Sequence, residues 1–374
     1  MNDILKFSAI IFISAIASSY LSSCFAIDLK IRNYDEGLIG LSLSFFGLGV
    51  MLSAIFHNYI RKKIKILSSL LIAALFQSIL VSFLLFDIHL LTIGFIIFFI
   101  GFTNGLNAMT IETHISSIYT KTSGFYIGLF WTSAGLGAIS GTLIIALNGI
   151  NEFSYQIGLV LILLQFIPIV LSKSNLNKIN LEKVAFVLSY NVVIKLKYIL
   201  LCVFFLGVSD AGFSSLYPSY LIDNGFIDKE IGQINFFAGT LALIFYPFMG
   251  KIIDKYNKVL IFNLICIINL FSLIYLNFTE NYYSIIFCTA FFYFSLGSVF
   301  LICFNIIGLN LKKNLIIYGV ASYTISENIG SFLGPNVIGN IISININYFF
   351  GIFVIFFLFI TFVFNFFQNT NNSG

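Results

Sequence analysis

The sequence has little charge: only 9% of its 374 residues are Asp, Glu, Lys or Arg, whereas 59% are hydrophobic. Its mean hydropathy is +1.01. Water-soluble domains carry about 25% charged residues, so this composition excludes that class. The basic residues form no stripe, which argues against nucleic acid as a partner. The chain is therefore predicted to be an integral membrane protein whose partners include lipid.

Motifs for catalysis, nucleotide binding and metal binding are also missing. No HExxH, GxSxG or Walker sequence occurs, and His57, His89 and His114 fall in separate segments. The cysteines share positions inside apolar runs and have no CxxC spacing: Cys24, Cys202, Cys266, Cys288 and Cys303. We expect no enzyme activity, no metal and no cofactor, and we interpret the cysteines as small buried residues.

Long apolar runs follow one another along the whole chain. Their limits are 5–27, 38–60, 66–86, 90–112, 125–148, 155–172, 198–221, 231–250, 259–276, 282–306, 316–339 and 345–367. Each can cross about 30 Å of hydrocarbon as a helix, and the alternating strands of a barrel are absent. The predicted fold class is all-α and polytopic, with twelve transmembrane helices. The first run ends in Leu21-Ser22-Ser23-Cys24, which also resembles a lipoprotein or secretory signal, but the helix count favours a retained span.

The basic residues are distributed unequally between alternate loops. If twelve spans are assumed, all of the 19 Lys and Arg residues except Lys30, Arg32 and Lys229 lie on one side. Cytoplasmic loops carry the excess of Lys and Arg in membrane proteins. Both termini are therefore predicted to be cytoplasmic. Abundant Ile, Asn, Lys and Phe indicate AT-rich coding and hence a bacterium, so the predicted location is the inner (plasma) membrane.

The longest polar break, residues 173–197, divides the chain into two halves of six spans, 1–172 and 198–374. Two features suggest an internal repeat. "YDEGLIG" at 34–40 resembles "IDKEIG" at 227–232, which places Asp210 opposite Ser18. In addition, Gly124 and Gly135 have the same spacing as Gly319 and Gly330, which would place Thr132 opposite Glu327.

Polar side chains are concentrated in every third span. The third, sixth, ninth and twelfth spans are nearly free of them, whereas the first, fourth, seventh and tenth contain Tyr20, Asn104, Asn107 and Asp210 among others. An unpaired polar group in lipid is unfavourable, so the polar spans should face protein or water. This pattern predicts a cavity between two similar halves.

Three acids lie within the spans: Glu112, Asp210 and Glu327. Glu112, with His114 close by, is near the cytoplasmic end of its span, where an interfacial role is favoured. Asp210 and Glu327 are central, and an acid at the bilayer centre costs about 2.5–3.5 kcal/mol, so such residues usually serve a site or a pathway. We interpret Asp210, Glu327, Asn104, Asn107, Glu112 and Tyr20 as candidates for substrate binding or proton coupling. For Asp210, the alternative is a helix-stabilising hydrogen bond.

The turn after the eighth span, "YPFMGKIIDKYNK", contains Gly250, Asp254, Lys255 and Lys258. It resembles the cytoplasmic signature of the major facilitator superfamily, in which the aspartate stabilises one conformation of the transporter. Asn257 stands where glycine is usual, although asparagine also tolerates a left-handed turn. In the first half only the basic run "RKKIK" remains of the corresponding signature.

Small residues in the fifth and eleventh spans extend the resemblance. "SAGLGAISG" contains Gly135, Gly137 and Gly141, and "GSFLGPNVIG" contains Gly330, Gly334 and Pro335. The second segment is similar to the glycine-proline element at the interface between the halves of the superfamily. Generic close packing of helices is the alternative, and both interpretations place these residues at helix contacts.

The resemblance implies a secondary active transporter that moves a small solute by alternating access. Because deep basic residues are missing, we expect a neutral or cationic, amphipathic solute. We expect coupling to protons because Asp210 and Glu327 are carboxyl groups within the spans. The expected protein is a monomer of an efflux-like or unassigned bacterial branch. The alternative is a sensor or scaffold that has a transporter fold but does not transport.

Overall fold

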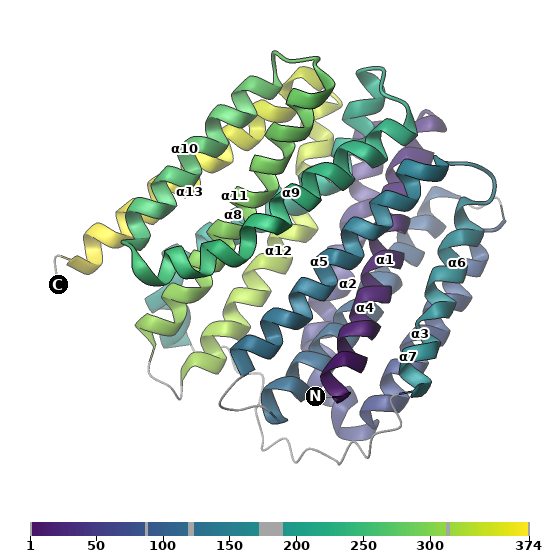
Figure 1. The fold of residues 1–374 in the computed structure, drawn as a ribbon, viewed down its shortest axis with the longest axis horizontal. Coiled ribbons are helices and arrows are strands. Elements are labelled where there is room, and N and C mark those ends of the chain that lie inside the picture. Colours follow the sequence, from purple (N-terminus) through teal and green to yellow (C-terminus); the bar gives the residue numbers. More distant parts are fainter. Residues whose placement is uncertain (1, 87–88, 119–122, 172–189, 312–314, 373–374) are drawn as a thin grey trace. The chain divides into compact units, whose positions relative to one another are not determined.

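The computed structural model describes residues 2–86, 89–118, 123–171, 190–311 and 315–372 (Figure 1). The elements are α1 (Asn2–Ile31), α2 (Glu36–Lys63), α3 (Ile66–Phe83), α4 (Leu90–Ile118), α5 (Ser123–Asn148), α6 (Ser154–Leu164), α7 (Phe166–Leu171), α8 (Tyr190–Asp223), α9 (Asp228–Lys255), α10 (Lys258–Leu276), α11 (Tyr282–Asn310), α12 (Ile316–Ile342), the 3₁₀ turn η2 (Ile346–Tyr348) and α13 (Phe349–Asn372). No strand occurs among these residues. The predicted all-α fold is therefore confirmed for the described part of the chain.

Eleven helical segments are long and apolar enough to cross a membrane. One of them, Ser154–Leu171, combines α6 and α7. Its break has a local cause, because Pro168 has no N–H to donate to the carbonyl of Leu164, where α6 ends. The helix α12 covers the predicted span 316–339 but is not among the eleven. The chain is a multi-pass membrane protein, and the total of twelve spans remains a prediction.

Several helices extend beyond the predicted spans. The first span was predicted at 5–27 and the seventh at 198–221, whereas α1 covers Asn2–Ile31 and α8 covers Tyr190–Asp223. A hydropathy run marks only the part of a helix within the hydrocarbon, and the helix continues into the polar interface. Of the predicted linker 173–197, the last residues form the first turns of α8, and residues 173–189 lie outside the described residues.

Internal contacts divide the chain into two compact units. Unit 1 comprises residues 1–33, 41–186 and 225–233, and unit 2 comprises residues 34–40, 187–224 and 234–374. Each unit therefore includes a short segment from the beginning of a helix that otherwise belongs to the other unit. For unit 1 this segment is the start of α9, and for unit 2 it is the start of α2.

In unit 1, α1 packs closely along α5. A Cβ atom on Gly137 would lie 2.3 Å from the carbonyl oxygen of Phe12, and one on Gly141 would lie 2.6 Å from that of Ile16. At both positions a side chain is excluded because the backbone of α1 occupies the space. Gly135, by contrast, is half-buried.

In unit 2, α8 packs along α12 in the same way. A Cβ atom on Gly330 would lie 2.1 Å from the carbonyl oxygen of Phe204, and one on Gly334 would lie 2.3 Å from that of Val208. In the opposite direction, Gly207 of α8 meets the carbonyl of Glu327, with a Cβ-to-oxygen distance of 2.3 Å. The two helix pairs thus share one mode of close contact.

These contacts correct the predicted register of the repeat. Phe12 and Phe204 occupy equivalent places, so Gly137 corresponds to Gly330 and Gly141 to Gly334. The sequence had aligned Gly135 with Gly330 because both follow a glycine at the same spacing. The pairing of Thr132 with Glu327 was therefore wrong by two positions, since the glycines that touch backbone define the register.

The two Ile-Gly pairs of the sequence also occupy equivalent places. Within unit 2, Gly40 near the start of α2 packs on the backbone of Pro335, whose carbonyl oxygen would lie 2.0 Å from an added Cβ. Within unit 1, Gly232 near the start of α9 packs on the backbone of Ala146, with a Cβ-to-nitrogen distance of 2.3 Å. The contact of Gly40 therefore explains why the start of α2 belongs to unit 2, and the contact of Gly232 explains why the start of α9 belongs to unit 1.

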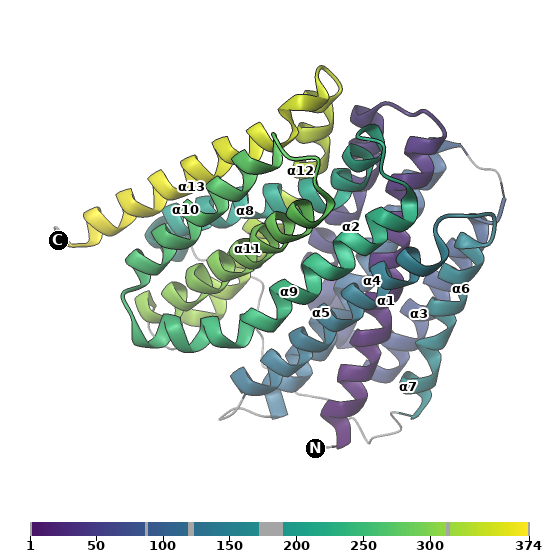
Figure 2. The ribbon, with the colours of Figure 1, turned by 45° about the horizontal axis from the view of Figure 1, so that its top comes forward.

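The apolar helices α10 and α13 run side by side in unit 2 (Figure 2). The rings of Phe262 and Phe364 stack with centroids 3.6 Å apart. The amides of Asn263 and Asn365 each donate from Nδ2 to the Oδ1 of the other, at 3.1 and 2.9 Å. These polar groups in mostly apolar helices therefore satisfy one another.

We expect Gly330→Ala to lower the thermal unfolding midpoint of the protein in detergent. The new Cβ would force the backbones of α8 and α12 apart, and such overpacking costs about 1–3 kcal/mol. Gly351→Ala in α13 is the matched control, because a Cβ there meets nothing within 4 Å. Equal midpoints for the two variants would contradict a stabilising role for this contact.

Candidate functional site

Asp210 lies in the middle of α8, where its side chain is exposed. Its neighbours Ser209 and Gly212 are buried in the packing of unit 2. No hydrogen bond or ion pair engages the Asp210 carboxylate within the part of the chain that the structure describes. The helix therefore presents an acid that remains available to an outside partner.

Three tyrosines from three other helices interact electrostatically with Asp210. They are Tyr246 of α9, Tyr293 of α11 and Tyr323 of α12. Tyr323 is buried, and the other two are half-buried. Unit 2 thus has three tyrosines within electrostatic range of one carboxylate.

Two of these tyrosines direct their hydroxyl hydrogens elsewhere. Tyr293 donates to Oδ1 of Asn235 at 2.9 Å, and Tyr323 donates to the carbonyl of Phe300 at 3.3 Å. A phenol has one hydrogen to donate, so neither hydroxyl can also donate to Asp210. The carboxylate oxygens therefore receive no hydrogen bond from these two tyrosines.

The third tyrosine depends on a glycine. A Cβ atom on Gly297 of α11 would lie 0.8 Å from the hydroxyl oxygen of Tyr246. In unit 1 the corresponding residue is Gly105 of α4, where a Cβ would lie 2.2 Å from Oγ of Ser53. The hydroxyl end of Tyr246 therefore occupies the space that a side chain at position 297 would fill.

Glu327, the second predicted acid, belongs to the same unit. It is half-buried on α12, one turn after Tyr323, with which it interacts electrostatically. Its backbone carbonyl touches Gly207, three residues before Asp210. The structure therefore places both acids on one closely packed pair of helices, α8 and α12.

Such a group of residues favours a positively charged partner. Carboxylates form charge-assisted hydrogen bonds with ammonium groups, and cations are attracted to aromatic faces within about 6 Å. Among its described neighbours, Asp210 interacts with no lysine or arginine. An anionic solute would meet only like charge here.

Asn104 is the centre of a hydrogen-bond network in unit 1. Its Nδ2 donates to Oγ of Ser18 at 2.7 Å, and its Oδ1 accepts from Oγ of Ser14 at 3.3 Å and from Nε2 of Gln77 at 2.7 Å. Gln77 also donates to Oγ1 of Thr103 at 2.8 Å. This network joins α1, α3 and α4, and most of its groups already have partners.

Asn107 and Tyr20, the other candidates of unit 1, are buried. Asn107 is 1% exposed, and neither of its amide atoms has a hydrogen-bond partner within the described residues. Tyr20 is fully buried, and its hydroxyl lies near Ser154 and Cys24. Both residues belong to unit 1, whereas Asp210 and Glu327 belong to unit 2.

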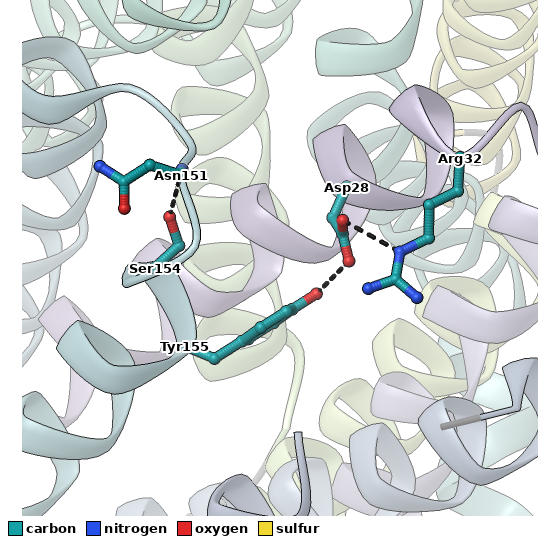
Figure 3. Close-up of polar contacts among 5 residues, drawn as sticks. All are labelled: Asp28, Arg32, Asn151, Ser154 and Tyr155. Atoms are coloured by element: carbon teal, nitrogen blue, oxygen red, sulfur yellow. Dashed lines mark hydrogen bonds and ion pairs between the residues drawn. The ribbon is translucent and has the colours of Figure 1, made fainter. Parts of the chain in front are cut away.

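A polar cluster that the sequence did not predict joins α1 to α6 (Figure 3). The carboxylate of Asp28 accepts from the hydroxyl of Tyr155 at 2.6 Å and from Nε of Arg32 at 3.1 Å. Nearby, the N–H of Asn151 donates to Oγ of Ser154 at 2.9 Å. The spacing of four between Asp28 and Arg32 was a visible signal, but Tyr155 is distant in the chain. The cluster fixes the end of α1 within unit 1.

The residues of the predicted conformational motif are only partly described. Gly250 and Asp254 lie in α9, and the side chain of Asp254 is outside the described residues. Lys255 is exposed in the last turn of α9, where a positive charge complements the helix dipole. Lys258 is the first residue of α10.

Asn257 differs from the expectation of a left-handed turn. Its φ is −64°, and its side chain caps α10 by accepting from the N–H of Val259 at 2.9 Å. Asn257 therefore acts as the N-cap of α10 through its side chain, which a glycine at this position does not have.

Glu112 and His114 lie in the last turns of α4, but their side chains fall outside the described residues. Their predicted interfacial role remains a prediction. Among the residues that are described, no group of three or more His, Cys, Asp or Glu side chains is arranged to hold a metal ion.

Comparisons with known proteins agree with the predicted resemblance to the major facilitator superfamily. The profile of the Major Facilitator Superfamily matches residues 7–335. A search of curated proteins finds no match.

Solved structures of transporters are similar over nearly the whole chain. The nucleoside transporter NupG has a TM-score of 0.76 at 12% identity, and a point mutant of it has 0.81 at 11%; each covers 98% of this chain and 99% of that chain. A bacterial homologue of the human lysosomal transporter Spinster, inward-facing and unoccupied, has a TM-score of 0.72 at 13% identity and covers 91% of this chain and 81% of that chain. At these identities the likeness shows the fold alone.

We expect Gly297→Ala to lower the unfolding midpoint, because its Cβ would displace the ring of Tyr246. In a Tyr246→Ala background the same substitution should cost little, since the obstructing ring is gone. A double-mutant cycle on unfolding midpoints measures this coupling. Additive effects of the two substitutions would contradict the contact.

Proposed function

Because the chain belongs to the major facilitator superfamily, we propose that it is a secondary active transporter that exchanges a small organic cation for protons by alternating access. The single observation that carries this proposal is the exposed carboxylate of Asp210 among three tyrosines. The superfamily match itself supports transport of a small molecule.

Asp210 binds the positive charge of the solute in this proposal. The rings of Tyr246 and Tyr293 supply cation–π contacts and an apolar surface for the rest of an amphipathic molecule. The support is that no described hydrogen bond competes for the carboxylate and that the hydroxyl of Tyr293 is engaged by Asn235.

Proton coupling follows from competition for the same oxygens. A carboxylate in a membrane helix binds either a proton or a cation, because each neutralises the same charge. Release of the cation on one side and of the proton on the other side gives exchange. Glu327, on the helix packed against α8, is the second candidate for carrying the proton.

The direction and location belong to the same proposal. The excess of Lys and Arg on one side of the predicted spans supports cytoplasmic termini, and we propose a bacterial inner membrane as the location. Proton entry would then drive export of the cation by a monomer.

A neutral polar solute is the second candidate, since nucleosides are what the name of NupG indicates for that protein. The amide network in unit 1 favours it, because Asn104 offers the hydrogen-bonding groups that such solutes need. Most of these groups are already bonded to one another, however. The carboxylate of Asp210 therefore gives the cation the stronger support.

Flux into liposomes that contain the purified protein tests the proposal. Ethidium serves as the organic cation and uridine as the neutral solute, each with and without a pH gradient. We expect gradient-dependent ethidium flux that Asp210→Asn reduces about tenfold or more, which corresponds to the loss of about 1.4 kcal/mol of binding.

Ser214→Ala is the matched control, because Ser214 is exposed one turn further along α8 and bonds to its own helix. Uridine flux without ethidium flux would contradict the assignment to cations. Ethidium flux with an unchanged pH dependence in Asp210→Asn would remove this residue from coupling. Binding without flux would identify a sensor.

A further inference from the structure

Three buried side chains between α10 and α11 lack partners. Asn269 of α10 is 0% exposed, and Ser295 and Ser298 of α11 are 1% and 0% exposed. Within the described structure, both amide atoms of Asn269 and both serine hydroxyl oxygens have no hydrogen bond. Leaving one such buried group unsatisfied costs about 1–3 kcal/mol. Because α10 and α11 pack against each other, a ligand shared by these four atoms would remove the cost.

Unit 1 contains the equivalent contact with a direct hydrogen bond between the two helices. The pair α3 and α4 begins at Ile66 and Leu90, and the pair α10 and α11 begins at Lys258 and Tyr282, with the same offset for both helices. This offset places Gln77 opposite Asn269 and Thr103 opposite Ser295. Nε2 of Gln77 donates directly to Oγ1 of Thr103 at 2.8 Å.

The units differ at this contact first in the length of the amide side chain. Asparagine is shorter than glutamine by one methylene group, so the amide of Asn269 stops short of Ser295 where Gln77 reaches Thr103. In addition, Leu296 stands where unit 1 has Asn104, the second acceptor for Gln77. The groups without partners include both a donor and acceptors, so they match a small molecule that both donates and accepts hydrogen bonds.

We propose that a buried water molecule bridges Asn269 of α10 to Ser295 and Ser298 of α11. Buried waters typically make about three hydrogen bonds, within a range of two to four, to groups that otherwise lack partners. The four atoms at this contact match that number. A metal cation does not fit, because it cannot accept from the N–H of Asn269.

The proposed water site lies on the face of α11 that is opposite Tyr293. At 3.6 residues per turn, Ser295 and Ser298 share one face of α11, whereas Tyr293 and Gly297 share the opposite face. The water thus connects α11 to α10 behind the tyrosine that neighbours Asp210. This bridge is independent of the proposed transport function, since it rests on burial and missing partners alone.

Thermal unfolding of Ser295→Ala tests the proposal, because alanine differs from serine only in lacking the hydroxyl group. If the hydroxyl is bonded to water, alanine removes that bond and lowers the midpoint. If the hydroxyl has no partner, alanine removes an unfavourable buried group and raises the midpoint. We expect the midpoint to fall.

Asn269→Gln should stay close to the original midpoint, because glutamine reaches Ser295 directly, as Gln77 reaches Thr103. Ser272→Ala is the matched control: Ser272 is a buried residue of the same helix and donates to the carbonyl of Ile268 at 3.0 Å. A raised midpoint for Ser295→Ala would overturn the proposal.

A density map of the protein in lipid, at a resolution that reveals waters, provides the direct observation. We expect a peak within hydrogen-bond distance of the Asn269 amide and of at least one serine, and no peak there in Asn269→Gln. An unoccupied site would overturn the proposal. A midpoint that rises in sodium but not in potassium would overturn it in favour of a cation.

Discussion

In a bilayer, two helices gain little by burying apolar side chains against each other, because lipid tails are equally apolar. The pairs α1 with α5 and α8 with α12 depend instead on glycines that let one backbone touch the other. These contacts also set the rotation of α8. Phe204, Gly207 and Val208 face α12, so Asp210 lies on a different face of α8. The position of the acid follows from where the glycines are.

The two units repeat this scaffold with different polar groups. Where unit 1 has Ser18 bonded to Asn104, unit 2 has Asp210 without a described partner. Gly105 is covered by a serine hydroxyl, and Gly297 by the larger Tyr246. Packing positions are thus shared, whereas the polar groups at equivalent positions differ. The proposed single charged site is consistent with this asymmetry, since a second acid at the centre of a span would be costly.

Much of the fold could be predicted from composition and charge. The apolar runs gave the helices, and the Ile-Gly pairs gave a register in which Gly40 and Gly232 do make equivalent contacts. The spacing of Gly124 and Gly135 predicted a wrong register for the fifth and eleventh spans. Only the contacts show that Gly137, two positions further on, is the glycine that packs on a neighbouring backbone. Asp210 stood out because a lone acid in an apolar run is unusual. Its tyrosines did not, since the sequence has 19 tyrosines and gives no side-chain direction. Gln77 was missed because its span was expected to face lipid.

The competition between a proton and a cation at Asp210 is the central claim, and calorimetry measures it directly. Binding of ethidium to the purified protein, in buffers of different ionisation enthalpy, yields the number of protons released per cation bound. The account predicts proton release on binding, and its loss in Asp210→Asn. Binding without proton release, or release that persists in Asp210→Asn, would contradict it.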